Sequence, residues 1–363
     1  MQFGLFFINE KPPGRSDQQV FNEALEQCRV ADELGFDCLW FGEHHFAPYG
    51  TMADTTLFGA AASQVTQTIQ LGTACIVPAF AHPVRVAEQC AMLDVLSGGR
   101  FHIGLGRGYQ QREFKGYGVP QSESKARFRE AVEIIEGLLT TENFTYEGQF
   151  WQTEDLTIAP MPVQERPPIY VAASITPDSF EWLVEKDFGA LIGNPYSVDP
   201  GVGTAATLLL EMQRAAGRPE SLDRTWGLLH NVLVDADAGR AAEIFRPNWD
   251  LSNSYLLKYA QAVEDGSPLP DDYKNYAGWW DWLEGMQYDD MLQMNACLIG
   301  DPDGVAEKLN IIYESTGVYK HLMWMNRGGA VPQSEMLRSM ELFAEKVIPQ
   351  VRHIGEPAQA LAG

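Results

Sequence analysis

The stretch LGTACIVPAFAHPVRVAEQCAMLDVLSGGRFHIGLGRGY, residues 71–109, decides the predicted fold. It links a short apolar run, Ile69–Val77, to a second one, Phe101–Leu105, through an amphipathic segment, Pro83–Leu96, that Ser97–Gly99 closes. Apolar runs of this length are typical of buried strands, and apolar residues at helical spacing between them are typical of a crossover helix. The stretch therefore predicts a strand–helix–strand unit with parallel strands.

The same alternation continues along the chain in both directions. Further strands are predicted at Gln2–Asn9, Cys38–Gly42, Pro168–Ala173, Gly189–Asn194, Thr225–Val234 and His321–Asn326. Further helices are predicted at Gln18–Leu34, Met52–Thr66, Glu123–Leu139, Asp178–Phe188, Ala205–Ala216 and Ser334–Val347. Eight apolar strands alternating with helices favour an α/β fold of the TIM (β/α)8 barrel type, with both faces of the sheet covered. A doubly wound open sheet is the alternative, because periodicity does not show closure.

One long segment interrupts this alternation. Trp249–Asp290, between the seventh and eighth predicted strands, is rich in tryptophan and tyrosine and contains only broken helix. An insertion of this length is usually a lid, a binding loop or an interface, and a small helical subdomain is the alternative. We expect one barrel domain over residues 1–354 and a flexible tail at 355–363.

Composition limits the classes of partner. Of 363 residues, 26 are Lys or Arg and 49 are Asp or Glu, which gives a net charge of −23. This charge argues against nonspecific binding to nucleic acid or to anionic membranes. The 5 cysteines form no C-x-x-C pair, and we expect reduced thiols in a cytoplasmic protein. No signal peptide is predicted, and no apolar run approaches the roughly 18 residues of a membrane span.

The segment after the second strand carries the most reactive side chains. Chemistry in a TIM barrel lies where strands end, and Glu43, His44 and His45 follow this strand directly. Adjacent residues of an extended segment point to opposite sides, so we expect at most one histidine to face the barrel mouth. Only Glu43 and one histidine converge, which is too few ligands for a metal and too few carboxylates for a glycosidase. A purely structural role for both histidines is the alternative.

Two segments could bind an anion. Gly106–Gly108 allows close backbone approach, and Arg107 within it offers a bidentate donor. Ser174 and Thr176 precede a predicted helix, where hydroxyl and N–H groups suit a phosphate, although the two residues could simply cap that helix. Arg327–Gly329, after the eighth strand, is a competing anion site.

Several of these segments resemble bacterial luciferase-like flavin monooxygenases. The resemblance rests on QFGLFF (2–7), ADELGFDCLWFGEHHF (31–46), the stretch at 71–109 and LRSMELFAEKVIPQV (337–351), and it is weakest over 240–295. It implies a TIM-barrel enzyme that takes reduced FMN (FMNH2) from a separate flavin reductase. With O2, such an enzyme oxygenates a small apolar or aromatic substrate, an aldehyde, a ketone or a ring, through a C4a-peroxyflavin. A homodimer is also implied.

The resemblance also implies roles for particular residues. His44, beside Glu43, is the expected catalytic residue, which exchanges a proton with the substrate or the peroxide. The expected flavin-binding residues are Ala74, Cys75, Gly106, Arg107, Tyr109, Ala173, Ser174, Thr176 and Asn194. Arg107 is expected at the phosphate, and the bond Ala74–Cys75 is expected to be a non-proline cis peptide under the flavin ring. Luciferase has a glutamate in place of Ala173 and a reactive cysteine in place of Gly106.

Two other functions stay open at this point. One is an F420-dependent oxidoreductase of a neighbouring branch, which transfers hydride without O2. The other is a non-catalytic flavin-binding protein. The aromatic insertion could shield the reaction from water, and it could equally form a subunit interface.

Overall fold

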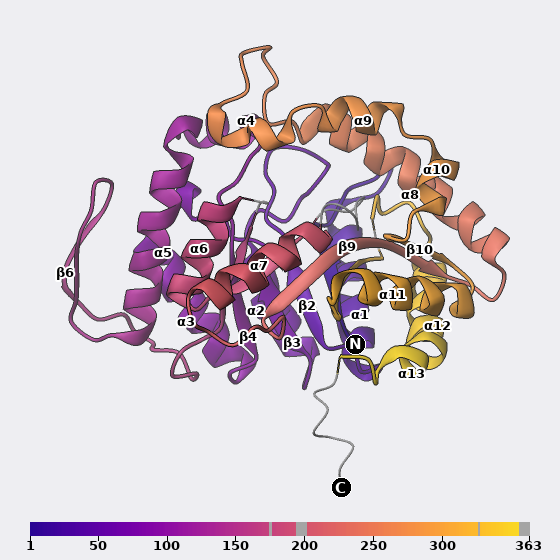
Figure 1. The fold of residues 1–363 in the computed structure, drawn as a ribbon, viewed down its shortest axis with the longest axis horizontal. Coiled ribbons are helices and arrows are strands. Elements are labelled where there is room, and N and C mark those ends of the chain that lie inside the picture. Colours follow the sequence, from indigo (N-terminus) through magenta and orange to yellow (C-terminus); the bar gives the residue numbers. More distant parts are fainter. Residues whose placement is uncertain (174–175, 194–201, 326, 356–363) are drawn as a thin grey trace, which may run out of the picture.

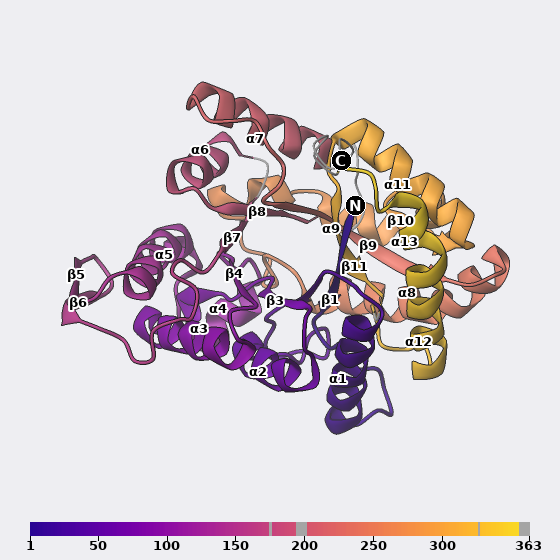
Figure 2. The ribbon, with the colours of Figure 1, turned by 90° about the horizontal axis from the view of Figure 1, so that it is seen from below.

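The computed structural model describes residues 1–173, 176–193, 202–325 and 327–355. Its main sheet is a closed barrel of parallel strands, which Figure 2 shows from below with the helices as an outer ring. The barrel strands, in order, are β1 (Gln2–Phe7), β2 (Cys38–Phe41), β3 (Gln70–Thr73), β4 (Phe101–Leu105), β7 (Ile169–Ala172), β8 (Gly189–Ile192), β9 (Thr225–Val234) and β11 (Lys320–Trp324). The pairings β8–β9 and β11–β1 close the ring, so the TIM barrel is confirmed and the open sheet is excluded.

Helices follow the strands around the outside. They are α1 (Asp17–Glu33), α2 (Thr55–Val65), α3 (Pro83–Ser97), α5 (Ser124–Thr140), α6 (Pro177–Lys186), α7 (Gly203–Ala215), α8 (Ala238–Tyr259), α11 (Pro302–Thr316), α12 (Gln333–Leu342) and α13 (Ile348–Val351), with a π-helical turn at Phe343–Val347. Local sequence sets their ends. Ser16 and Gln19 form a capping box that begins α1, and Gly98, at φ 70°, ends α3 in the left-handed conformation.

Several elements were not predicted from the sequence, among them three short strands and the helix α11. The strand β10 (Cys297–Gly300) pairs in parallel with the C-terminal half of β9, Asn231–Val234, and α11 follows it. A hairpin of β5 (Phe144–Glu147) and β6 (Gln152–Leu156) occupies the polar segment before β7. The run of β10 is only four residues long and directly follows the insertion, so its periodicity is too weak to separate it from a loop.

The insertion begins later than predicted. Trp249–Tyr259 belongs to α8, a continuous helix of 22 residues that contains Pro247 in its interior. The remainder is a 3-10 helix, η4 (Asp271–Tyr276), and two short helices, α9 (Trp279–Gly285) and α10 (Tyr288–Gln293). Figure 1 shows this orange segment across the end of the barrel opposite the N-terminus. It therefore covers the end at which the parallel strands finish.

The opposite end of the barrel is filled by aromatic side chains. Trp40 is fully buried and packs edge-to-face on Tyr170 and Trp226. A Cβ added at Gly4 or Gly72 would lie 2.7 Å or 2.5 Å from the Trp40 ring. The two glycines make room for the indole, and the packed interior leaves chemistry to the other end.

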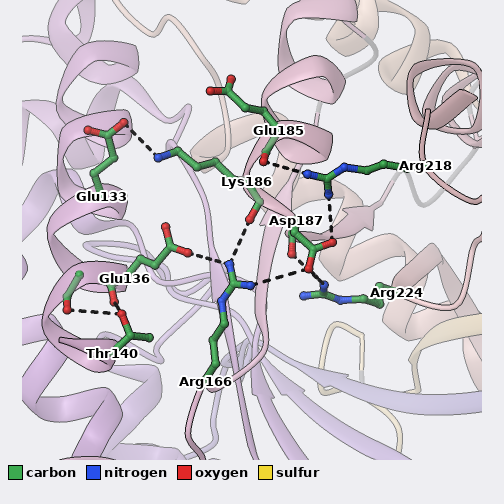
Figure 3. Close-up of polar contacts among 10 residues, drawn as sticks. Glu133, Glu136, Thr140, Arg166, Glu185, Lys186, Asp187, Arg218 and Arg224 are labelled. Carbon is green, nitrogen blue, oxygen red and sulfur yellow. Dashed lines mark hydrogen bonds and ion pairs between the residues drawn. The ribbon is translucent and has the colours of Figure 1, made fainter. Parts of the chain in front are cut away.

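Near this packed end, ion pairs fasten the loops. The carboxylate of Asp187, directly after α6, contacts Arg218 at 3.2 Å, Arg224 at 3.0 Å and Arg166 at 3.8 Å (Figure 3). These side chains are about half exposed, so each pair contributes well under about 1 kcal/mol. Their role is to join the end of α6 to the loops that lead into β7 and β9.

Candidate active site at the mouth of the barrel

The residues predicted to react or to bind flavin lie at the C-terminal ends of neighbouring strands. Glu43 and His44 follow β2, Ala74 and Cys75 follow β3, Gly106, Arg107 and Tyr109 follow β4, and Ala173 and Thr176 follow β7. In the register of β4 with β7, Leu105 pairs with Val171, which brings Arg107 and Ala173 to adjacent strand ends. Ser174 and Asn194 lie outside the described residues.

The ring of His44 is held from one side by helix α4 (Gln111–Tyr117) and its N-cap. Nδ1 lies 3.1 Å from Oε1 of Glu113 and 3.1 Å from the amide nitrogen of Gln110. One nitrogen cannot donate to Glu113 and accept from Gln110 at once, and a carboxylate favours a proton on Nδ1. Gln110 then donates to the Tyr109 hydroxyl, 3.4 Å away. In this state Nε2, on the other side of the ring from Glu113 and Gln110, carries the lone pair.

Glu113 is the functional side chain that the sequence prediction missed. It is 2% exposed, and its Oε1 also accepts the backbone N–H of His45 at 2.9 Å. The available signal was its position, in a polar segment directly after the strand end that carries Arg107. No periodicity connects residue 113 with residue 44, so only the fold shows the pair.

Glu43 pairs with the other histidine. Its Oε1 accepts from Nε2 of His45 at 2.8 Å, and its Oε2 accepts the N–H of Val77 at 3.2 Å. Nδ1 of His45 accepts from the hydroxyl of Tyr117 at 3.1 Å. Burial raises the pKa of Glu43, and the bond from His45 opposes that rise. The expectation that Glu43 converges with one histidine is therefore met by His45, while His44 has its own carboxylate.

The strand end of β3 has the backbone that the resemblance implies. The peptide bond Ala74–Cys75 is cis. Burial raises the pKa of Cys75 to about 12, so its thiol is neutral at neutral pH. A Cβ added at Gly106 would lie 3.0 Å from Cβ and 3.3 Å from Sγ of Cys75. Gly106 thus makes room for the Cys75 side chain between the two strand ends.

Arg107 contacts the insertion. Its Nη2 donates to the backbone carbonyl of Asp272 at 2.8 Å, and Nη1 lies 3.8 Å from the Asp272 carboxylate. The guanidinium lies 4.2 Å from the centre of the Tyr273 ring. The side chain is 22% exposed, so a partly solvated cation with its plane fixed by an aromatic ring stands at the mouth.

Aromatic rings of the insertion stack on the end of β4. Tyr276 stacks on Tyr109 with 5.4 Å between ring centres and 9° between planes, and Trp280 stacks on Tyr276 at 5.9 Å. Burial raises the pKa of Tyr109, so its hydroxyl stays protonated. The insertion therefore presents apolar ring faces at the mouth, beside the Asp272 carboxylate that lies near Arg107.

A second polar cluster lies where β1, β9 and β11 end. Arg327 is fully buried, and it donates to Oγ of Ser252 at 2.9 Å and to Oδ1 of Asn231 at 2.6 Å. Ser252 donates to Glu10 at 2.7 Å, and the charge of Arg327 acts on the same carboxylate. Burial raises the pKa of Glu10 to about 7. The guanidinium of Arg327, predicted as a competing anion site, is therefore enclosed by internal partners, and its binding of an anion stays a prediction.

Three further observations concern the whole described chain. Residues 1–173, 176–193, 202–325 and 327–355 contain no group of three or more His, Cys, Asp or Glu side chains able to hold a metal. All five cysteines are free thiols. Within the same ranges, no helix has both the length and the apolar character needed to cross a membrane.

Known proteins share this architecture. Residues 1–320 match the family model described as luciferase-like monooxygenase. The oxygenase component of flavin-dependent trigonelline monooxygenase from Acinetobacter baylyi is 27% identical over 96% of this chain and 95% of its own length. The monooxygenase RslO1 from Streptomyces bottropensis superposes with a TM-score of 0.83 at 28% identity, covering 96% of this chain and 99% of that one.

More distant structures share the fold alone. The oxygenating constituent of 3,6-diketocamphane monooxygenase from Pseudomonas putida, in complex with FMN, has a TM-score of 0.79 at 22% identity, covering 96% of this chain and 98% of that one. An F420-dependent tetrahydromethanopterin reductase from Methanopyrus kandleri has a TM-score of 0.68 at 22% identity, covering 96% and 98%. The match over residues 1–320 decides the relationship, and the chain belongs to the luciferase-like monooxygenase family.

Proposed function

We propose that this chain is the oxygenase component of a two-component flavin monooxygenase. It would take reduced FMN from a separate reductase and O2, and oxygenate a small apolar or aromatic aldehyde, ketone or ring. The observation that carries the proposal is the His44–Glu113 pair, because it leaves a histidine nitrogen with a free lone pair at the mouth of the barrel. The trigonelline monooxygenase component, a relative that aligns over 96% of this chain and 95% of its own length, supports it.

The donor set at the strand ends fits FMN. Arg107 is a partly exposed cation, and a phosphate dianion would exchange favourably for its neutral carbonyl partner. Thr176 caps the N-terminus of α6 on the neighbouring strand end, where N–H groups and a hydroxyl suit the same phosphate. We assign the phosphate to Arg107, Thr176 and Ser174, and the flavin ring to Ala74, Cys75, Gly106, Tyr109, Ala173 and Asn194. Reduced FMN, when bound, supplies the electrons that activate O2.

The chain's own residues orient the reactants, exclude water and move a proton. Nε2 of His44 would accept or return the proton of the substrate, while Glu113 stabilises the ring when it is charged. Glu43 would act one step further away, by fixing His45 and the β2–β3 strand ends. The rings of Tyr109, Tyr276 and Trp280 would keep the site dry and offer a flat apolar surface to the substrate.

We also propose that two copies pair through helices α2 and α3. These packed helices expose large apolar side chains, among them Leu57 at 72%, Leu96 at 49% and Met92 at 48%. Exposed apolar residues gathered on two adjacent helices are characteristic of a subunit interface. A second copy of the same chain would cover its own identical face by twofold symmetry.

The proposal is tested by the fate of oxygen. The purified protein is mixed with photoreduced FMN and 18O2, together with apolar aldehydes, cyclic ketones or planar aromatics, and products are examined by mass spectrometry. We expect one 18O atom in a product with wild-type protein and a large loss with His44→Ala. Products without 18O, together with oxidation of reduced F420 under anaerobic conditions, would favour hydride transfer, for which the fold likeness to the F420-dependent reductase is the supporting observation. Tight FMN binding with neither reaction would leave a flavin-binding protein.

A further inference from the structure

Helix α4, which carries Glu113, is fastened by the insertion. The helix has only seven residues, and its N-cap, Gln110, makes no side-chain capping bond. The backbone N–H of Gln111 instead donates to the carbonyl of Gln261 at 3.2 Å. A helix of about two turns is only marginally stable on its own. The N–H groups of its first turn have no acceptor within the helix and need one from outside it. The segment Gln261–Ser267 of the insertion supplies that acceptor.

The side chain of Gln111 clasps the same segment. It is 8% exposed, and its Oε1 accepts the backbone N–H of Glu264 at 2.8 Å. Its Nε2 donates to Oδ1 of Asp265 at 3.3 Å and to Oγ of Ser267 at 3.4 Å. Both ends of the amide are therefore satisfied by the insertion. A buried amide paired at both ends fixes the geometry of the two segments it joins.

The other contacts between the two segments are more exposed. Arg112 pairs with Glu264 at 3.0 Å and Lys115 with Asp265 at 2.8 Å. Ion pairs of this exposure contribute little. Gln111 is therefore the main side-chain clasp, although it faces the insertion and is not hydrogen-bonded to His44 or Glu113.

We propose that Gln111 is a positioning residue. By clasping Gln261–Ser267 to α4, it holds Glu113 against His44 and keeps the proton of His44 on Nδ1. Packing of the insertion against α4 and the position of the His44 proton are then coupled, because α4 takes part in both contacts. This inference rests on the proposed function of His44 only where turnover is measured, because the proton position can be observed without flavin or substrate.

The test is selective 15N-histidine NMR of the flavin-free protein, with the His44 signals assigned from His44→Gln. We expect Nδ1–H in the wild type and a mixture shifted toward Nε2–H in Gln111→Ala. Turnover should fall about tenfold, as loss of several hydrogen bonds implies, with KM changing less than kcat. The matched control is Gln213→Ala. This variant removes a similar glutamine clasp, to both backbone groups of Ser221 at 2.8 and 3.0 Å, on the far side of the barrel.

A charge exchange tests the clasp itself. Gln111→Glu alone places a carboxylate against Asp265 and should reproduce the shift, whereas adding Asp265→Asn restores a donor–acceptor pair and should return the wild-type spectrum. These two proteins also replace Gln111→Ala if that variant does not fold. An unchanged His44 spectrum in Gln111→Glu and Gln111→Ala overturns the proposal. A shifted spectrum in a protein that never oxygenates a substrate overturns the proposed function and leaves the positioning role standing.

Discussion

Exchanging the two buried carboxylates for amides, one at a time, separates their roles. Glu113→Gln keeps the shape of the side chain and an acceptor for the His45 N–H, but removes the charge beside Nδ1 of His44. Glu43→Gln makes the same change at a residue bonded to His45 and Val77, with no bond to His44. Glu113→Gln should therefore slow turnover, and Glu43→Gln should leave the His44 proton in place.

The size of the effect follows from the bond that is weakened. A hydrogen bond to a charged group contributes about 1.5–3 kcal/mol and a neutral one about 0.5–1.5, so the change costs about 1–1.5 kcal/mol. If that difference appears fully when His44 becomes charged in the transition state, kcat falls about tenfold. Because burial raises the pKa of Glu43, its neutral replacement should cost little stability.

The assay is the rate of 18O incorporation under saturating reduced FMN and substrate, with circular dichroism to confirm folding. Wild type, Glu113→Gln and Glu43→Gln are compared across pH. Loss of the charge that stabilises protonated His44 should shift the pH dependence of the turnover rate as well as lower its maximum. The reasoning is refuted if Glu43→Gln, correctly folded, is as slow as Glu113→Gln or slower. Equal rates for all three proteins would remove the His44–Glu113 pair from the mechanism.

Three further outcomes follow from the structure. Gly104→Ala should destabilise by at least about 3 kcal/mol in urea unfolding, because its Cβ would lie 1.7 Å from the carbonyl oxygen of Thr73. Burial lowers the pKa of His230 to about 4, so the unfolded chain binds the extra proton between pH 6.5 and 4. The free energy of unfolding should therefore fall by about 3 kcal/mol over that range as pH drops. His230→Gln should remove this pH-dependent contribution, which urea titrations at pH 7 and 4.5 would measure. Leu57→Asp should give a monomer in sedimentation velocity, whereas Val163→Asp, at a residue that is 61% exposed but lies outside α2 and α3, should not.

The barrel could be predicted from sequence because its signal is local. Each strand is a short apolar run and each helix has an apolar stripe, so segments such as Phe101–Leu105 appear at the right place. The strand ends then point to His44 and Arg107. The partners of these residues could not be predicted. Glu113 and Asp272 reach them from a short helix and a 3-10 turn whose orientation depends on packing between segments far apart in the chain.

Burial also separates the two arginines that follow strand ends. Arg327 is enclosed with Glu10, and removing a partner from a buried pair costs about 3–5 kcal/mol, so an anion at Arg327 would have to displace buried partners. Arg107 is bound to a neutral carbonyl and lies 3.8 Å from an exposed carboxylate, both of which a phosphate dianion can replace with stronger bonds. An anionic ligand is therefore favoured on the β4–β7 side of the mouth. We propose that a ligand with its anionic end there extends its planar ring toward the ends of β2 and β3, which precede His44 and Cys75. The burial of the Glu10 carboxylate with Arg327 thus favours one orientation of the ligand, with its anionic end at Arg107.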